Sequence, residues 1–196
     1  MSRCKGAVVV LGVLLATPVS AFEFSAERMV KQGGKLTASS VKADGQRWRF
    51  EYREPQAGAQ VCIVRQDRRF AWLILSSLWA FVEIPIAGDH MLLVDERMGG
   101  EVAREQFGTE VVNGYRTEVF QVTVDREGER LLFYQWVTVA ERFAIRTVSK
   151  NGDWLLEYSK VKFAPQYWRY FEPPRGYAPK AFNPHSSGYG PERKRS

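Results

Sequence analysis

The residue types that do most chemistry near neutral pH are scarce in this sequence of 196 residues, which has two histidines and two cysteines. A Ser-His-Asp or Cys-His nucleophile would depend on His90 alone, because His185 lies in a Gly- and Pro-rich stretch near the end of the chain. No serine stands in a nucleophile-elbow motif. The sequence therefore predicts a protein that is not an enzyme. Carboxylates clustered around His90 inside a cleft would be the arrangement that argues for catalysis.

Metal and cofactor sites find equally little support. No pair of cysteines or histidines stands at metal-ligand spacing, and the soft set of His90, Met91 and Met98 is a weak match to a copper site. Cys62 lies in an apolar stretch, residues 61–64, which favours a buried structural thiol. Because the sequence also lacks a glycine-rich phosphate-binding loop, we expect no metal and no cofactor.

Aromatic side chains are the residues that remain to be explained, with 6 Trp, 12 Phe and 8 Tyr in one small protein. Filling of a large core accounts for most of them. A curved sheet, however, has a concave face that its own side chains can leave unfilled, which provides a cavity for an apolar ligand. The residues that we predict to line such a face are Trp48, Phe50, Trp72, Trp79 and Phe81.

Strands must position these residues, because polar and apolar side chains alternate with a period of two from Glu23 to Phe163. Asn151-Gly152 between two alternating runs is typical of a hairpin turn. The segment 88–107 lacks the alternation, and we expect two short helices there, broken at Gly99-Gly100. The predicted strands cover residues 48–53, 61–66, 70–75, 79–84, 117–125, 130–139, 143–149 and 154–163. This pattern predicts a mainly β (α+β) fold with one strongly curved antiparallel sheet.

The chain begins with the features of a cleaved signal peptide. Arg3 and Lys5 precede an apolar run, residues 6–16, and Val19-Ser20-Ala21 provides a small-residue cleavage site. We therefore expect a signal peptide over 1–21, one domain over 22–182 and a disordered basic tail over 183–196. The apolar run is too short to remain as a membrane anchor, so the mature protein is expected in the periplasm with no transmembrane segment.

Charge argues against nucleic acid as a partner. Cleavage after Ala21 would lower the formal net charge from +6 to +4, because the removed segment holds Arg3 and Lys5. Three of the remaining positive charges, Arg193, Lys194 and Arg195, stand together in the tail. The folded domain is thus only weakly basic, whereas nucleic-acid binding relies on many contacts to phosphates.

Several short motifs occur along the mature chain in an order that is similar to a known group. They are Trp48–Glu51, Phe70–Ile74, Trp79–Pro85, Gly108–Tyr115, Gln135-Trp136 and Phe171–Tyr177. In this order they resemble the LolA-like group of periplasmic proteins, and more closely a secreted bacterial family of unknown function near that group. The resemblance implies an incomplete antiparallel β-barrel wrapped round helices that cover its concave side. It carries over no functional residue.

The resemblance also implies a function, because proteins similar to LolA carry the acyl chains of lipoproteins in a hydrophobic half-barrel. We therefore expect a periplasmic protein that binds or carries a lipid or a lipoprotein acyl chain. The alternative is an envelope module with a solid core, which would bind a protein through an exposed strand edge or through the aromatic segment Tyr167 to Phe171. An unfilled concave face favours the first hypothesis, and a filled one favours the second.

Overall fold

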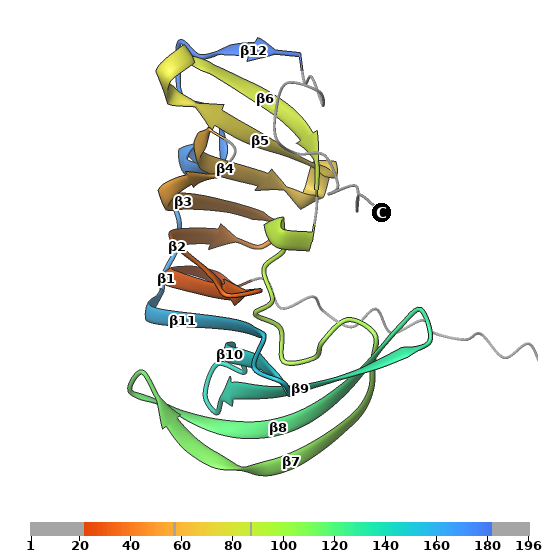
Figure 1. Ribbon diagram of the computed structural model, residues 1–196. Coiled ribbons are helices and arrows are strands. Elements are labelled where there is room, and N and C mark those ends of the chain that lie inside the picture. The colour runs from red at the N-terminus through yellow and green to blue at the C-terminus, as the bar shows by residue number, and fades with distance from the viewer. Residues whose placement is uncertain (1–21, 57, 87, 182–196) are drawn as a thin grey trace, which may run out of the picture.

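The computed structural model describes residues 22–56, 58–86 and 88–181. The predicted signal peptide over 1–21 and the predicted tail over 183–196 lie outside the described residues. The described chain forms one twelve-stranded sheet in the order β12-β6-β5-β4-β3-β2-β1-β11-β10-β9-β8-β7 (Figure 1). The strands are β1 (Glu23–Gln32), β2 (Lys35–Asp44), β3 (Arg47–Gln56), β4 (Ala59–Arg65), β5 (Phe70–Leu75), β6 (Ala80–Pro85), β7 (Glu101–Val112), β8 (Tyr115–Arg126), β9 (Glu129–Thr138), β10 (Ala144–Ser149), β11 (Trp154–Phe163) and β12 (Ala178–Lys180).

The sheet is open, because the strands at its two ends, β12 and β7, do not pair with each other. Every neighbouring pair is antiparallel except β12 and β6, which run parallel. Its lower part, from β11 to β7, curves strongly (Figure 1). The predicted mainly β fold with an incomplete barrel is confirmed.

Tight turns join the strands of the lower part. Asn113 and Gly114 both have positive φ, 50° and 85°, between β7 and β8, and Glu127 and Gly128 have 54° and 88° between β8 and β9. Positive φ at both central residues is the requirement of a type I′ turn, whose twist matches that of the flanking strands. Asn113-Gly114 is a pair typical of such turns, whereas Glu127 takes the left-handed conformation without being glycine or asparagine.

The predicted helices over 88–107 are wrong. The described residues contain no α-helix, and this region holds a 3₁₀ turn, η3 (Gly88–His90), an extended stretch and then β7. The error has a physical cause: Glu101 and Arg104 form an ion pair of 2.8 Å with side chains 7% exposed, so these two charges are shielded at the start of a strand whose other residues are mostly exposed. Gly100, with φ 76°, turns the chain into β7, and a Cβ there would lie 2.8 Å from the carbonyl oxygen of Asp125.

Both faces of the sheet carry a core. On the concave face the largest cluster includes Phe24, Phe50 and Tyr158, and the chain that leaves β6 crosses this face and inserts Leu92 and Val94 into the cluster (Figure 1). We call residues 91–98 of that chain the covering segment. It takes the place of the covering helices that the resemblance implied. On the opposite face a smaller cluster around Trp72 is sealed by Phe171 of η4 (Trp168–Phe171).

Candidate functional site: an open pocket on the concave face

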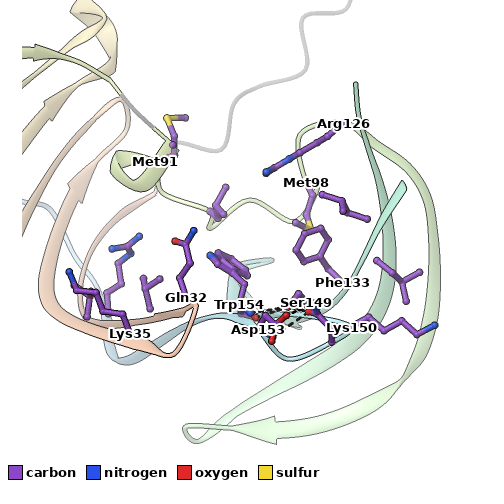
Figure 2. A pocket seen from close by; sticks show the side chains of 18 of the residues that line it. Gln32, Lys35, Met91, Met98, Arg126, Phe133, Ser149, Lys150, Asp153 and Trp154 are labelled. Atoms are coloured by element: carbon purple, nitrogen blue, oxygen red, sulfur yellow. Dashed lines mark hydrogen bonds between the residues drawn. The ribbon is translucent and has the colours of Figure 1, made fainter. Parts of the chain in front are cut away.

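An open pocket of about 1380 Å³ lies between the concave face and the covering segment (Figure 2). Strands β1, β2 and β3 form one wall, the covering segment forms the roof, and β8 to β11 with their turns form the other wall. The volume exceeds the roughly 300–1,000 Å³ that is usual for small-molecule sites. The concave face is therefore filled in its centre and unfilled towards this side.

Apolar side chains make up one part of the pocket lining. They are Val30, Met91, Leu93, Met98, Leu131, Leu132, Phe133 and Trp154. The rings of Phe133 and Trp154 meet edge to face, with centroids 6.1 Å apart, and Figure 2 shows them side by side below Met98. Methionine is flexible and polarisable, so Met91 and Met98 can adapt to ligands of irregular shape.

Cations make up a second part of the lining. They are Arg28, Lys35, Arg126, Arg130 and Lys150, whereas Asp153 is the one carboxylate among the described residues that line the pocket. Elsewhere in the structure arginines form ion pairs with carboxylates, as Arg142 does with Glu96 and Glu118. In the part of the chain that the structure describes, no carboxylate lies within ion-pair distance of any of the five pocket cations. The pocket thus has a positive potential that favours an anion.

Arg28 differs from the other pocket cations because it is buried, with 8% of its surface exposed. Its guanidinium carbon lies 4.8 Å from the ring centre of Phe50, a cation–π contact. Its Nε has no hydrogen-bond partner, and neither has the hydroxyl of Ser39. Burial raises the pKa of the Tyr158 hydroxyl, and the positive charge of Arg28 offsets part of the shift. That hydroxyl therefore stays protonated near neutral pH and can donate.

Two of the five aromatic residues predicted to bind ligand lie on the concave face. Trp48 and Phe50 are 3% and 0% exposed and belong to the central core under the covering segment. Trp48 Nε1 donates a hydrogen bond of 2.7 Å to the carbonyl oxygen of His90, where the chain enters the covering segment. Neither residue lines the pocket, so a ligand-binding role for them stays a prediction.

The other three residues do not share that face, so the prediction of one common face is wrong. Trp72 and Phe81 pack on the opposite face with Phe171. The register explains it: Phe50 pairs with Cys62 and Cys62 with Leu73, so Leu73 shares the face of Phe50 and its neighbour Trp72 points the other way.

Trp79 lies in the turn before β6, where it has φ 48° and is 66% exposed. Its ring contacts that of Tyr177, with centroids 5.6 Å apart. It therefore lies at the surface, outside the pocket.

The pocket residues themselves were missed, although one signal was available. Phe24, Ala26, Arg28 and Val30 occupy alternate positions of β1, so a single arginine interrupts an otherwise apolar face. Such an interruption indicates a function, because charged residues are rarely buried without a partner.

Metal binding and catalysis gain no positive support. No group of three or more His, Cys, Asp or Glu residues placed to hold a metal ion occurs among the described residues. His90 is 1% exposed and does not line the pocket. In the same part of the chain no helix has the length and apolar character needed to span a membrane.

Comparisons with known proteins give a fold and no family. No family model matches the sequence, and no curated protein matches it. The structure of MucB is similar, with a TM-score of 0.54 and 12% identity over 81% of this chain and 59% of that one. The complex structure of Pseudomonas aeruginosa MucA/MucB gives a TM-score of 0.51 and 12% identity over 79% of this chain and 56% of that one. The lipoprotein LppX of Mycobacterium tuberculosis gives a TM-score of 0.44 and 16% identity over 73% of this chain and 88% of that one.

This chain shares its fold with part of MucB. It spans less than two thirds of the MucB chain, and at 12% identity the likeness extends to the fold alone. The likeness to MucB agrees with the open, curved antiparallel sheet that the LolA-like resemblance implied.

Proposed function

We propose that the protein is a non-enzymatic periplasmic binding protein that holds the acyl chain of an amphiphilic ligand in the concave pocket. The observation that carries this proposal is the pocket of about 1380 Å³ with an apolar lining that the protein's own side chains leave open. Transfer of an acyl chain from water into it is favourable by about 25 cal/mol for each Å² of apolar surface removed from water. Export to the periplasm follows from the predicted signal peptide over 1–21.

Hydrogen bonds to the middle of the covering segment support a pocket that exists before the ligand arrives. Ala144 N donates to Val94 O at 2.8 Å, and Gln135 Nε2 donates to Asp95 O at 3.3 Å. Arg104 donates to Glu96 O at 2.6 Å. Because these contacts hold the backbone, ligand binding needs little ordering of the chain, and the cost of binding is correspondingly small.

Quenching of tryptophan fluorescence by brominated acyl chains tests the proposal, because Trp154 lines the pocket. We expect a bromine-labelled amphiphile to quench the wild-type protein and to quench a Trp154→Phe variant much less. Leu93→Asp, which puts a charge on the roof, should weaken binding by about 10-fold or more. Leu78→Asp is the matched control, since Leu78 is 56% exposed on a turn away from the pocket. A wild-type protein that takes up no amphiphile would refute the proposal.

A protein-binding role is the second candidate, and the free edge of β7 favours it. This strand of twelve residues pairs on one side with β8 and ends the sheet on the other. Its exposed apolar residues are Val102, Phe107 and Val111, 58%, 70% and 66% exposed. An open edge with apolar side chains is a template on which an extended segment of another protein can add a strand. MucB has been solved in complex with MucA, so a likeness in fold is compatible with a protein partner.

Photo-crosslinking in the periplasm would decide for this alternative. A crosslinking amino acid at position 107 should capture a discrete partner if β7 is the interface. The same amino acid at position 168 tests whether the aromatic segment Tyr167 to Phe171 binds a partner instead. Trp168 is 52% exposed on the opposite side of the sheet. Equal, diffuse labelling at both positions would rule out a specific partner at β7.

A further inference from the structure

A row of buried polar residues crosses the concave floor of the sheet. Arg28 on β1 stands opposite Ser39 on β2 and opposite Tyr158 on β11, and Ser39 stands opposite Tyr52 on β3. Register alone thus places four polar side chains next to one another on four neighbouring strands, all of them less than 9% exposed. The adjacent row is apolar, since Ala26 pairs with Val41 and Val41 with Phe50. The polar row is a distinct feature of this face.

Polar atoms in this row lack partners that proteins ordinarily supply. Arg28 Nε and Ser39 Oγ are buried without a hydrogen bond, and the described residues provide no carboxylate within ion-pair distance of Arg28. Leaving a buried polar atom unpaired costs free energy, and a buried charge costs more. Arg65 shows the usual solution, since it is 4% exposed and bonded to Asp67 and Glu172.

Arg28 also lines the concave pocket, so its guanidinium, whose Nε has no hydrogen-bond partner, is reachable from the space that we assign to the ligand. A guanidinium offers five N–H donors in a planar fork that matches the two oxygens of a carboxylate or of a phosphate. A ligand with such a group would supply the missing partner. The chain of that ligand would then run along the apolar wall from Val30 to Met98 and Phe133.

We infer that Arg28 is an anion subsite at the floor of the pocket, which binds the carboxylate or phosphate group of an acyl ligand, with the hydroxyls of Ser39 and Tyr158 as neighbouring donors. This inference rests on the proposed function and narrows it, because it selects acidic amphiphiles over neutral ones. The cations Arg126, Arg130 and Lys150 attract the ligand to the pocket, whereas Arg28 fixes its head group.

Calorimetric titration with three ligands of equal chain length tests the inference: dodecanoate, dodecyl phosphate and dodecanol. We expect the two acidic ligands to bind the wild-type protein about 10-fold or more tightly than dodecanol, since a charge-assisted hydrogen bond contributes more than a neutral one. Arg28→Gln should lose this preference and bind dodecanol as before. Arg28→Lys keeps the charge without the fork and should retain part of the preference.

The outcomes separate the inference from the function on which it rests. Equal binding of all three ligands by the wild-type protein overturns the anion subsite and leaves acyl binding intact, whereas binding of none overturns the proposed function as well. A preference that survives Arg28→Gln but vanishes in Arg126→Gln/Arg130→Gln/Lys150→Gln places the head group elsewhere and overturns the inference. If inorganic phosphate binds as tightly as dodecyl phosphate, the acyl chain contributes nothing to the affinity, and this result also overturns the inference.

A folding control accompanies these titrations. Arg28→Met keeps an unbranched apolar stem that reaches as far as the Nε position of arginine and has no charge, so it removes the unpaired group and leaves a smaller cavity than a shorter side chain would. If Arg28→Gln fails to fold, Arg28→Met is titrated in its place, with the same expected loss of preference.

Discussion

At the scale of single residues, two buried arginines, Arg65 and Arg28, differ in whether they have carboxylate partners. Arg65 lies between Asp67 and Glu172, and its bond to Glu172 joins the sheet to the segment that follows η4. Arg28 is buried to a similar degree and lies near the ring of Phe50, Ser39 and Tyr158, but it forms no ion pair with a carboxylate of the described residues. Arg65 therefore stabilises the fold, whereas the burial of Arg28 costs free energy of folding. A structural role alone does not explain why Arg28 is there.

This difference predicts opposite effects on stability. Arg28→Met should leave the free energy of unfolding unchanged or raise it by about 1–3 kcal/mol, because it removes a buried charge that has no counterion. Arg65→Met should lower it by about 2–3 kcal/mol, because Asp67 and Glu172 lose their partner. Urea denaturation of the two variants compares them directly. A larger loss in Arg28→Met than in Arg65→Met would mean that Arg28 is structural.

At the scale of elements, the covering segment depends on one tryptophan from the core. Trp48→Phe keeps most of the buried ring and removes the hydrogen bond to His90 O. We expect a loss of about 1 kcal/mol in stability and faster hydrogen exchange in the segment 91–98 than in strands β4 and β5. Exchange measured by mass spectrometry checks this. Phe171, which is buried in the cluster on the opposite face of the sheet, offers Phe171→Leu as a control for general loosening.

The start of β7 carries a pH-sensitive element. Burial alone would raise the pKa of Glu101, but hydrogen bonds from Arg104, the backbone N–H of Met98 and Arg97 lower it from 4.5 to about 2. A lowered pKa stabilises the folded state at pH above 4.5, and this stabilisation is lost as the pH falls from 4.5 towards 2. The shift corresponds to on the order of 3 kcal/mol at neutral pH.

Glu101→Gln should therefore flatten the acid side of the stability curve. We expect the melting temperature of the wild-type protein to fall between pH 5 and pH 2 more steeply than that of the variant, while the variant starts lower at pH 7. Glu105, which is exposed on the same strand, provides the matched control Glu105→Gln. Parallel curves for the wild type and Glu101→Gln would contradict the role assigned to this carboxylate.

At the scale of the whole molecule, the sequence predicted the strands better than their faces. Segments such as 70–75 and 154–163 alternate so clearly that their bounds agree with β5 and β11. The face of Trp72 could not be obtained that way, because a period of two leaves both faces open until the partner strand and register are known. The start of β7 was predicted as a helix because Glu101 and Arg104 look like two solvated charges in the sequence, whereas they form a buried ion pair in the structure.

The pocket could be foreseen as a type of feature but not as a set of residues. Its lining comes from strands and turns as distant along the chain as Val30, Met91 and Trp154. Only the order of strands, in which β1 lies beside β11, brings these segments together. Arg28 was the one member with a local signal, as a charge on an apolar strand face.

The pairing of β1 with β11 also has a consequence for biosynthesis. The first strand to be made stands near the middle of the sheet, and one of its two neighbours is made more than 120 residues later, as in the pair Arg28 and Tyr158. Until that strand emerges, one edge of β1 has no partner and the concave core lacks Leu156 and Tyr158. Contacts so distant along the chain form slowly. A nascent chain with this topology stays incompletely folded until nearly all of it exists, which is the state that a translocation channel can thread.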